Sequence, residues 1–279
     1  MTATSAAPAA PATTSESIRL NATPRVQYVL RIADTCLIHA QRLAEWCGHG
    51  PVLEEDIALT NMALDLLGQA RALLTHAGQL DGHGFSEDQL AFLRDEGEFY
   101  NLTLVELPLR KPSGHLPGGD FADTVLRNFL LASWLKGLWT QLVSSTDAEL
   151  AAIAGQALKE SRYHQQHNGD WVVRLGDGSA ESAARMRAAL ERAWPYTKEM
   201  FTSDAVDDVA AAGGLGPARS ALREDWQQDV AEVLLYAELP PLADTPFVST
   251  GTLGRHSEHM GFILAEMQVL QRTHPGGRW

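Results

Sequence analysis

The side chains of this sequence that are best suited to chemistry are a few carboxylates and histidines within helical segments. Glu45, Asp65, Glu160 and His164 are the candidates. A di-iron centre in a helical bundle takes a carboxylate from each of two helices and a Glu-x-x-His from each of the other two. The Glu and His of that motif are three apart on one helix face, whereas Glu160 and His164 are four apart, a spacing that usually marks a hydrogen bond. A degenerate or mononuclear iron site from these four residues is therefore kept as an alternative.

A second group of polar residues precedes the last predicted helix, in His256-Ser257-Glu258-His259. Ser257 suits a helix N-cap, and Glu258 suits the positive end of the helix dipole. We therefore interpret the group as a helix start. A metal-storage or metal-sensing role for His256 and His259 is the weaker alternative.

The elements that must position these residues are predicted to be helices, because apolar residues recur three and four apart almost throughout. Gly48 and Gly78 are expected to end the first two helices, and Pro195 to kink or shorten its own. No segment has the period of a strand. The predicted helices are 25–47, 54–77, 86–93, 120–144, 147–175, 179–200, 217–239 and 256–272, with a short piece at 99–106, a loop at 107–119 and a possible short helix within 204–216.

Short loops between long helices make the helices antiparallel neighbours. The pattern is typical of an all-α, ferritin-like four-helix bundle with additional helices, or of another large helical bundle. Residues 1–22, rich in Ala, Thr, Ser and Pro, are predicted to be a disordered tail, and residues 23–279 a single domain. Cys36 and Cys47 are too far apart along one helix to bridge, so both are expected to be reduced core residues of a cytoplasmic protein.

Composition excludes some classes of partner. The formal net charge of −13 makes nucleic acid a poor partner, because phosphate binding needs a basic surface. The longest apolar stretches are interrupted by charged or amide residues, so no membrane span is predicted.

Four separated blocks resemble the C-subunit family of the bacterial multicomponent 1,2-phenylacetyl-CoA epoxidases. The similarity runs over about residues 26–279. The blocks are Gln41-Arg42-Leu43-Ala44-Glu45-Trp46-Cys47-Gly48-His49, Leu64-Asp65-Leu66-Leu67-Gly68-Gln69-Ala70-Arg71, Lys159-Glu160-Ser161-Arg162-Tyr163-His164, and His256-Ser257-Glu258-His259-Met260-Gly261 with Leu264-Ala265-Glu266-Met267-Gln268.

The resemblance implies that a di-iron site has been lost. The related catalytic subunit has Asp-Glu-Ala-Gly-His where this chain has Asp65 to Gln69, so Leu66 replaces a ligand Glu and Gln69 a ligand His. Ser161 replaces a second ligand Glu, while His164 keeps its histidine. The resemblance further matches Glu45 to a retained first carboxylate and Lys136 to the acid of the third helix. No catalytic, cofactor-binding or metal-binding residue is therefore expected in this chain.

The same resemblance implies a non-catalytic structural subunit, partnered with the catalytic A subunit in a heterotetrameric core. Iron and most contacts to phenylacetyl-CoA are then expected in the partner. We also expect Lys136 to replace the charge of the missing iron by pairing with Glu45 or near His164. On that hypothesis, Lys136→Ala lowers the melting temperature.

Overall fold

The computed structural model describes residues 16–108 and 119–277 of the chain. These residues form nine α-helices and no strand beyond an isolated bridge between Thr250 and Arg255, which confirms the predicted all-α, ferritin-like class. The helices are α1 (Pro24–Ala44), α2 (Leu53–Asp81), α3 (Glu87–Phe92), α4 (Phe121–Leu142), α5 (Ala148–Gly176), α6 (Ala180–Thr197), α7 (Ala205–Ala212), α8 (Arg223–Tyr236) and α9 (Glu258–Thr273). Five short 3-10 helices, η1 (Glu96–Glu98), η2 (Thr103–Glu106), η3 (Lys198–Phe201), η4 (Arg219–Leu222) and η5 (Gly251–Leu253), join them.

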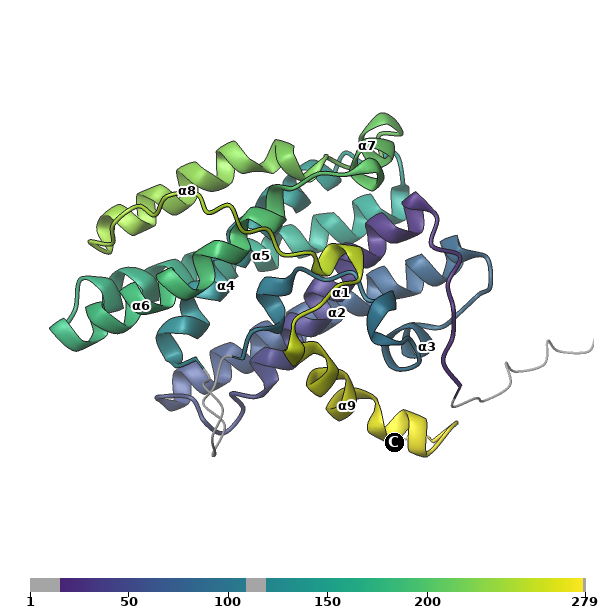
Figure 1. Ribbon diagram of the computed structural model, residues 1–279, viewed down its shortest axis with the longest axis horizontal. Helices are drawn as coiled ribbons and strands as arrows, with labels where there is room; N and C mark the ends of the chain where they lie inside the picture. The colour runs from purple at the N-terminus through teal and green to yellow at the C-terminus, as the bar shows by residue number, and fades with distance from the viewer. Residues whose placement is uncertain (1–15, 109–118, 278–279) are drawn as a thin grey trace, which may run out of the picture.

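Four long helices form the core bundle. α1 packs along α2, and α4 along α5, while α2 and α5 join the two pairs (Figure 1). Local sequence determines where three of these helices begin. Their N-cap residues are Thr23, Asp120 and Asp147, whose side chains accept hydrogen bonds from backbone N–H groups of the first turn. Within the described residues, no helix is both long and apolar enough to cross a membrane.

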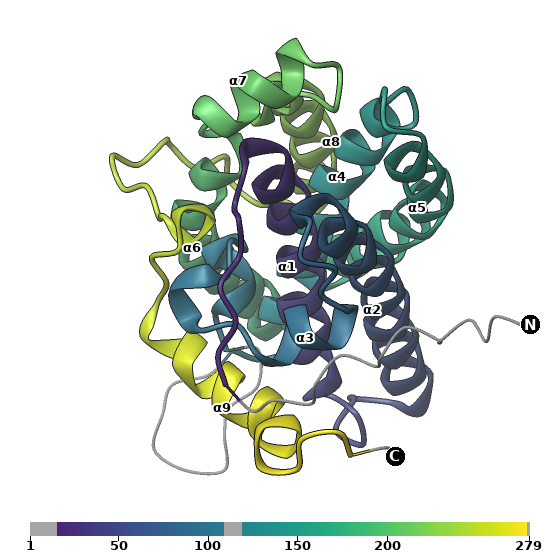
Figure 2. The ribbon, with the colours of Figure 1, turned by 90° about the vertical axis from the view of Figure 1, so that its right-hand side faces the viewer.

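The additional helices surround the bundle unevenly. α6 and α8 pack on α4 and α5, α7 packs on α1, and α9 packs on α3 near the 3-10 helices η1 and η2 (Figure 2). Of these additional helices, the short α3 is the one that packs substantially on α2 in the described part of the chain. Several side chains on the outer face of the first half of α2 are therefore left exposed.

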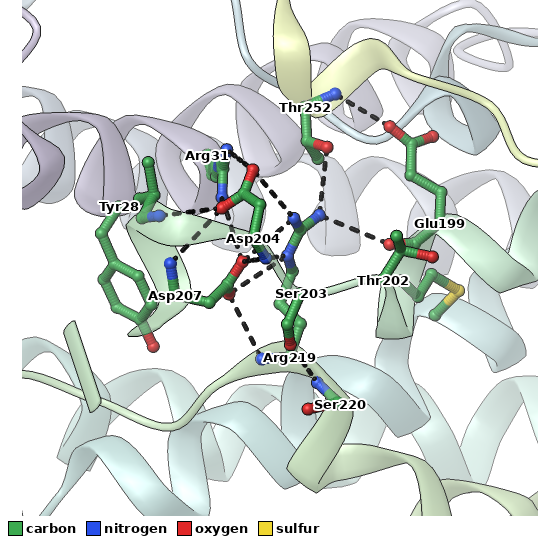
Figure 3. A network of polar contacts seen from close by, with 12 residues as sticks. Tyr28, Arg31, Glu199, Thr202, Ser203, Asp204, Asp207, Arg219, Ser220 and Thr252 are labelled. Atoms are coloured by element: carbon green, nitrogen blue, oxygen red, sulfur yellow. Dashed lines mark hydrogen bonds and ion pairs between the residues drawn. The ribbon is translucent and has the colours of Figure 1, made fainter. Parts of the chain in front are cut away.

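A buried ion network fixes α7 and η4 to α1 (Figure 3). Arg31 of α1 binds Asp204 with two hydrogen bonds, at 2.9 and 2.6 Å, and contacts Asp207 at 3.2 Å. Arg219 binds Asp207 from η4 at 3.1 Å. The Nη1 group of Arg219 also donates to the hydroxyl of Thr252 at 3.0 Å, which extends the network to the segment before α9. Each arginine is thus paired with a carboxylate, as buried charges require.

The predicted ends of the first two helices are wrong. α1 ends at Ala44, three residues before the predicted end at Cys47. α2 continues past Gly78 to Asp81 and ends at Gly82, whose φ of 85° suits glycine. A Cβ at Gly78 would lie 2.0 Å from the carbonyl oxygen of Phe85, so this glycine permits a close approach instead of ending a helix. Pro195 lies in the last turn of α6, which ends at Thr197 and tightens into η3, so this helix stops before residue 200 as expected.

The expected limits of the tail and of the core also change. Ile18 is buried, and its N–H donates to the carbonyl of Leu93 at 3.0 Å, so the packed chain begins before residue 23. Residues 1–15 lie outside the described residues, as does most of the predicted 107–119 loop. Cys36 is buried as expected, but Cys47 is exposed because it follows the end of α1. Neither cysteine forms a disulfide.

Candidate functional site

Gln69 occupies the centre of the polar interior between α1, α2 and α5. Its Oε1 lies 3.6 Å from Sγ of Cys36 on α1. Its Nε2 donates to Oε2 of Glu160 on α5 at 2.9 Å, and the other oxygen of that carboxylate accepts from Gln156 at 2.8 Å. The amide of Gln69 therefore links Cys36 of α1 to Glu160 of α5.

Two histidine–carboxylate pairs continue the contact between α2 and α5. Nε2 of His164 lies 3.0 Å from Oδ2 of Asp65, and Nε2 of His167 lies 3.0 Å from Oε2 of Glu55. Glu160 and His164 thus each bind a residue of α2. This agrees with the hydrogen-bond interpretation of their four-residue spacing.

The two remaining interior positions carry no metal-binding group. Leu66 and Ser161 are buried, and Oγ of Ser161 has no hydrogen-bond partner among the described residues. Nor do the described residues contain any group of three or more His, Cys, Asp or Glu side chains placed to hold a metal ion. A di-iron centre needs several hard carboxylate ligands, so the leucine, glutamine and serine present here do not fit one.

Two groups of α1 beside this interior, the Cys36 thiol and the His39 imidazole, are neutral. Burial, reinforced by the charges of Glu160 and Asp34, raises the pKa of the Cys36 thiol, so it stays protonated. Burial and the neighbouring Arg127 lower the pKa of His39 well below its ordinary value of 6.5, so the imidazole stays neutral. Neither group supplies the negative charge that an iron pair requires.

Two positions matched by resemblance lie elsewhere. Glu45 is the C-cap residue of α1, nine residues beyond Cys36 and thus about 13 Å farther along the axis. Its carboxylate pairs with Arg42 at 2.5 Å. Lys136 does not pair with Glu45 or near His164, because it lies on the partly exposed face of α4 and binds Asp229 of α8 at 2.5 Å. The expected replacement of iron by Lys136 is therefore wrong, and Glu45 does not join Asp65, Glu160 and His164 in one site.

Sequence reasoning missed the acid that holds His256. Glu106 and His256 have fully buried side chains, and Nδ1 of the imidazole lies 2.7 Å from Oε1 of Glu106. The same carboxylate accepts from the N–H and hydroxyl of Ser257 and from the amide of Asn101. Ser257 is the N-cap of α9, as predicted. The partner lies 150 residues away in sequence, so no local pattern indicates it.

Comparisons with known proteins match this chain to one family. A family model described as "Phenylacetic acid catabolic protein" matches residues 9–279. The chain is 43% identical over 252 residues to the C subunit of 1,2-phenylacetyl-CoA epoxidase from Escherichia coli strain K12. That similarity covers 90% of this chain and 98% of the relative.

Proposed function

The chain belongs to the phenylacetic acid catabolic protein family, and on this premise we propose that it is the non-catalytic structural subunit of a multicomponent 1,2-phenylacetyl-CoA epoxidase. In this role it stabilises the di-iron catalytic A subunit during aerobic phenylacetate degradation. Its similarity to the C subunit of such an epoxidase, over nearly the whole length of both chains, supports the assignment.

The observation that carries the proposal is the composition of the bundle interior. Leu66, Gln69 and Ser161 occupy the positions where the catalytic relative is expected to bind iron. The amide of Gln69, on α2, forms hydrogen bonds with the neutral thiol of Cys36 on α1 and with the carboxylate of Glu160 on α5. Side chains of the bundle itself therefore hold these helices together. Iron chemistry and most contacts to phenylacetyl-CoA are then tasks of the partner subunit.

The exposed face of α2 is the part of the bundle that suits a partner. Leu53, Ile57 and Leu64 lie on this face, and each side chain is more than half exposed. Their spacing of four and seven residues aligns them in one stripe along the helix. Tyr163 of the neighbouring α5 is similarly exposed. Permanent interfaces bury about 2,000 Å² or more and are more apolar than ordinary protein surface. We therefore assign this α2 stripe to the contact with the A subunit in the heterotetrameric core.

The test is co-purification of the A subunit with tagged variants of this chain. Ile57→Asp combined with Leu64→Asp is expected to abolish most of the capture, because both charges would be buried at the interface. Leu235→Asp on α8, another exposed leucine, is the matched control and should leave capture unchanged. Melting temperatures of all variants should stay close to that of the wild type. Failure of the wild-type chain to capture an A subunit would refute the function, whereas undiminished capture by the double variant would refute only the surface.

A further inference from the structure

Gly68 is an exposed glycine near the middle of the long helix α2. A Cβ added at this position would meet no atom within 4 Å beyond its own turn of helix, so packing within the described part of the chain does not require a glycine here. Gly176 of α5, by contrast, has such a reason, because a Cβ there would lie 2.3 Å from the carbonyl oxygen of Ala237. Glycine is the least favourable residue inside a helix after proline. Gly68 therefore weakens α2 without improving a contact inside this chain.

The outward positions that lead to Gly68 form an uncharged stripe. Ile57, Asn61, Leu64 and Gly68 are all exposed, and their spacings of four, three and four place them on one face of α2. The distance between two packed helices is about 8–10 Å and depends on the side chains at the point of contact. A glycine at that point allows the closest approach. The stripe is thus shaped for a helix that crosses α2 at Gly68 and packs on Leu64 one turn away.

The charges beside the stripe indicate what occupies it. Lys159 and Arg162 lie on the exposed face of α5, which neighbours α2 along one edge of the molecule (Figure 2). Neither cation has an ion-pair partner among the described residues. The exposed stripe of α2 offers no carboxylate, so a second copy of this chain turned onto it could not pair with them. Charge complementarity therefore favours a different chain, one with carboxylates at the edge of its contact surface.

We propose, on the basis of the proposed function, that a helix of the A subunit crosses α2 at Gly68, with its backbone against the glycine and carboxylates toward Lys159 and Arg162. Leu64 packs along one side of the crossing helix. Tyr163 of α5, 54% exposed, packs along the other. The core of a stable interface is packed as densely as a protein interior, so this crossing leaves no room for a larger side chain at position 68.

Co-purification of the A subunit with tagged, full-length variants tests the crossing. Gly68→Leu places a large side chain between the two helix backbones, so capture should fall by about tenfold or more. An apolar surface without a close crossing would instead gain contact area from the leucine. Capture that is unchanged or increased in Gly68→Leu would therefore overturn the proposal.

The stability of the isolated chain should move in the opposite direction. Alanine is a better helix former than glycine, and position 68 is open in the isolated chain, so Gly68→Ala should raise the melting temperature by about 2–3 °C. Gly68→Leu should not lower it. A lower melting temperature for Gly68→Ala would show that the glycine serves the fold of this chain, which would refute the crossing.

Gly155→Leu is the matched control. Gly155 also lies inside a long helix, α5, and a Cβ there would likewise meet nothing within 4 Å. Its exposed neighbours one turn away are Ala152 and Lys159, so it adjoins no large apolar side chain. Gly155→Leu should capture the A subunit as the wild type does. A loss equal to that of Gly68→Leu would show that position 68 is not special and would refute the crossing.

Charge reversal tests the identity of the occupant. Lys159→Glu combined with Arg162→Glu should reduce capture by about tenfold, because like charges would then meet at the edge of the contact. Arg187→Glu, an exposed arginine on α6, should leave it unchanged. Full capture by the charge-reversed chain would refute the carboxylates assigned to the partner. Failure of the wild-type chain to capture an A subunit would refute the proposed function itself, whereas equal capture by wild type and Gly68→Leu would refute only the crossing.

Discussion

His256 makes two hydrogen bonds that only a doubly protonated imidazole can make together. Nδ1 faces the carboxylate of Glu106 at 2.7 Å, and Nε2 faces the carbonyl oxygen of Phe99 at 3.0 Å. Both partners accept, so both ring nitrogens must donate. Burial alone lowers the pKa of His256, but the hydrogen bond and attraction to Glu106 outweigh it, and the pKa is raised above its ordinary value of 6.5.

This raised pKa predicts a pH-dependent anchor for α9. The stabilisation should be fully present below pH 6.5 and should be lost as the pH rises through the higher pKa of the folded state. His256→Gln breaks a buried ion pair, so the free energy of unfolding should fall by about 3–5 kcal/mol below that pH, and by less in alkaline solution. Urea unfolding across this pH range measures the difference. His259→Gln is the control, and an equal loss at every pH would contradict the protonated pair.

The structure changes the stability effect expected for Lys136, for which the sequence analysis predicted a lower melting temperature on substitution by alanine. Its ammonium group and the carboxylate of Asp229 are each about a quarter to a third exposed. Solvent screens such a pair, which contributes about 0–1 kcal/mol. Lys136→Ala should therefore change the melting temperature little, as should Asp229→Ala. Thermal unfolding followed by circular dichroism checks this, and a loss of several kcal/mol would mean that Lys136 supports the bundle interior after all.

At the scale of elements, the ion network ties α7 and η4 to α1. Asp207 is buried and accepts hydrogen bonds from both Arg31 and Arg219. Burial raises the pKa of Asp204, but its hydrogen bonds to Arg31 outweigh that effect and hold the pKa well below 3.8. The stability that Asp204 contributes is thus present above about pH 4 and lost as the pH falls further.

Asp207→Asn should leave two buried guanidinium groups without their shared carboxylate. The free energy of unfolding should fall by about 3–5 kcal/mol at neutral pH, as for other broken buried pairs. Asp208→Asn, one residue along on the exposed side of α7, should cost little. Chemical denaturation of the two variants compares them directly. Equal stability of the two would show that the network does not hold α7 to α1.

The helices themselves were largely predictable, because the signals that form them are local. Apolar periodicity and the caps Asp120, Asp147 and Ser257 indicated helices that the structure confirms. The end of α2 was not predictable, because Gly78 allows the carbonyl group of Phe85 to approach the helix closely. That contact forms only in the folded chain. The same limit applies to Lys136, since only the packing of α8 on α4 brings it to Asp229.

At the scale of the whole molecule, the candidate site was predictable only in part. Leu66, Gln69 and Ser161 were singled out by the resemblance to the catalytic subunit and not by their spacing, and all three are buried in the structure. Glu45 was misplaced because α1 ends before it. The residue of α1 that contacts Gln69 is Cys36 instead. Pairings across the bundle depend on how helices cross, which no single segment encodes.

The central claim is that this chain supports a catalytic partner without binding iron itself. Iron content per chain, measured by plasma mass spectrometry after anaerobic incubation with ferrous iron, tests it most directly. We expect far less than one iron atom per chain for this protein alone, and stoichiometric iron for the co-purified complex with the A subunit. One or two tightly held iron atoms per chain in the isolated protein would contradict it.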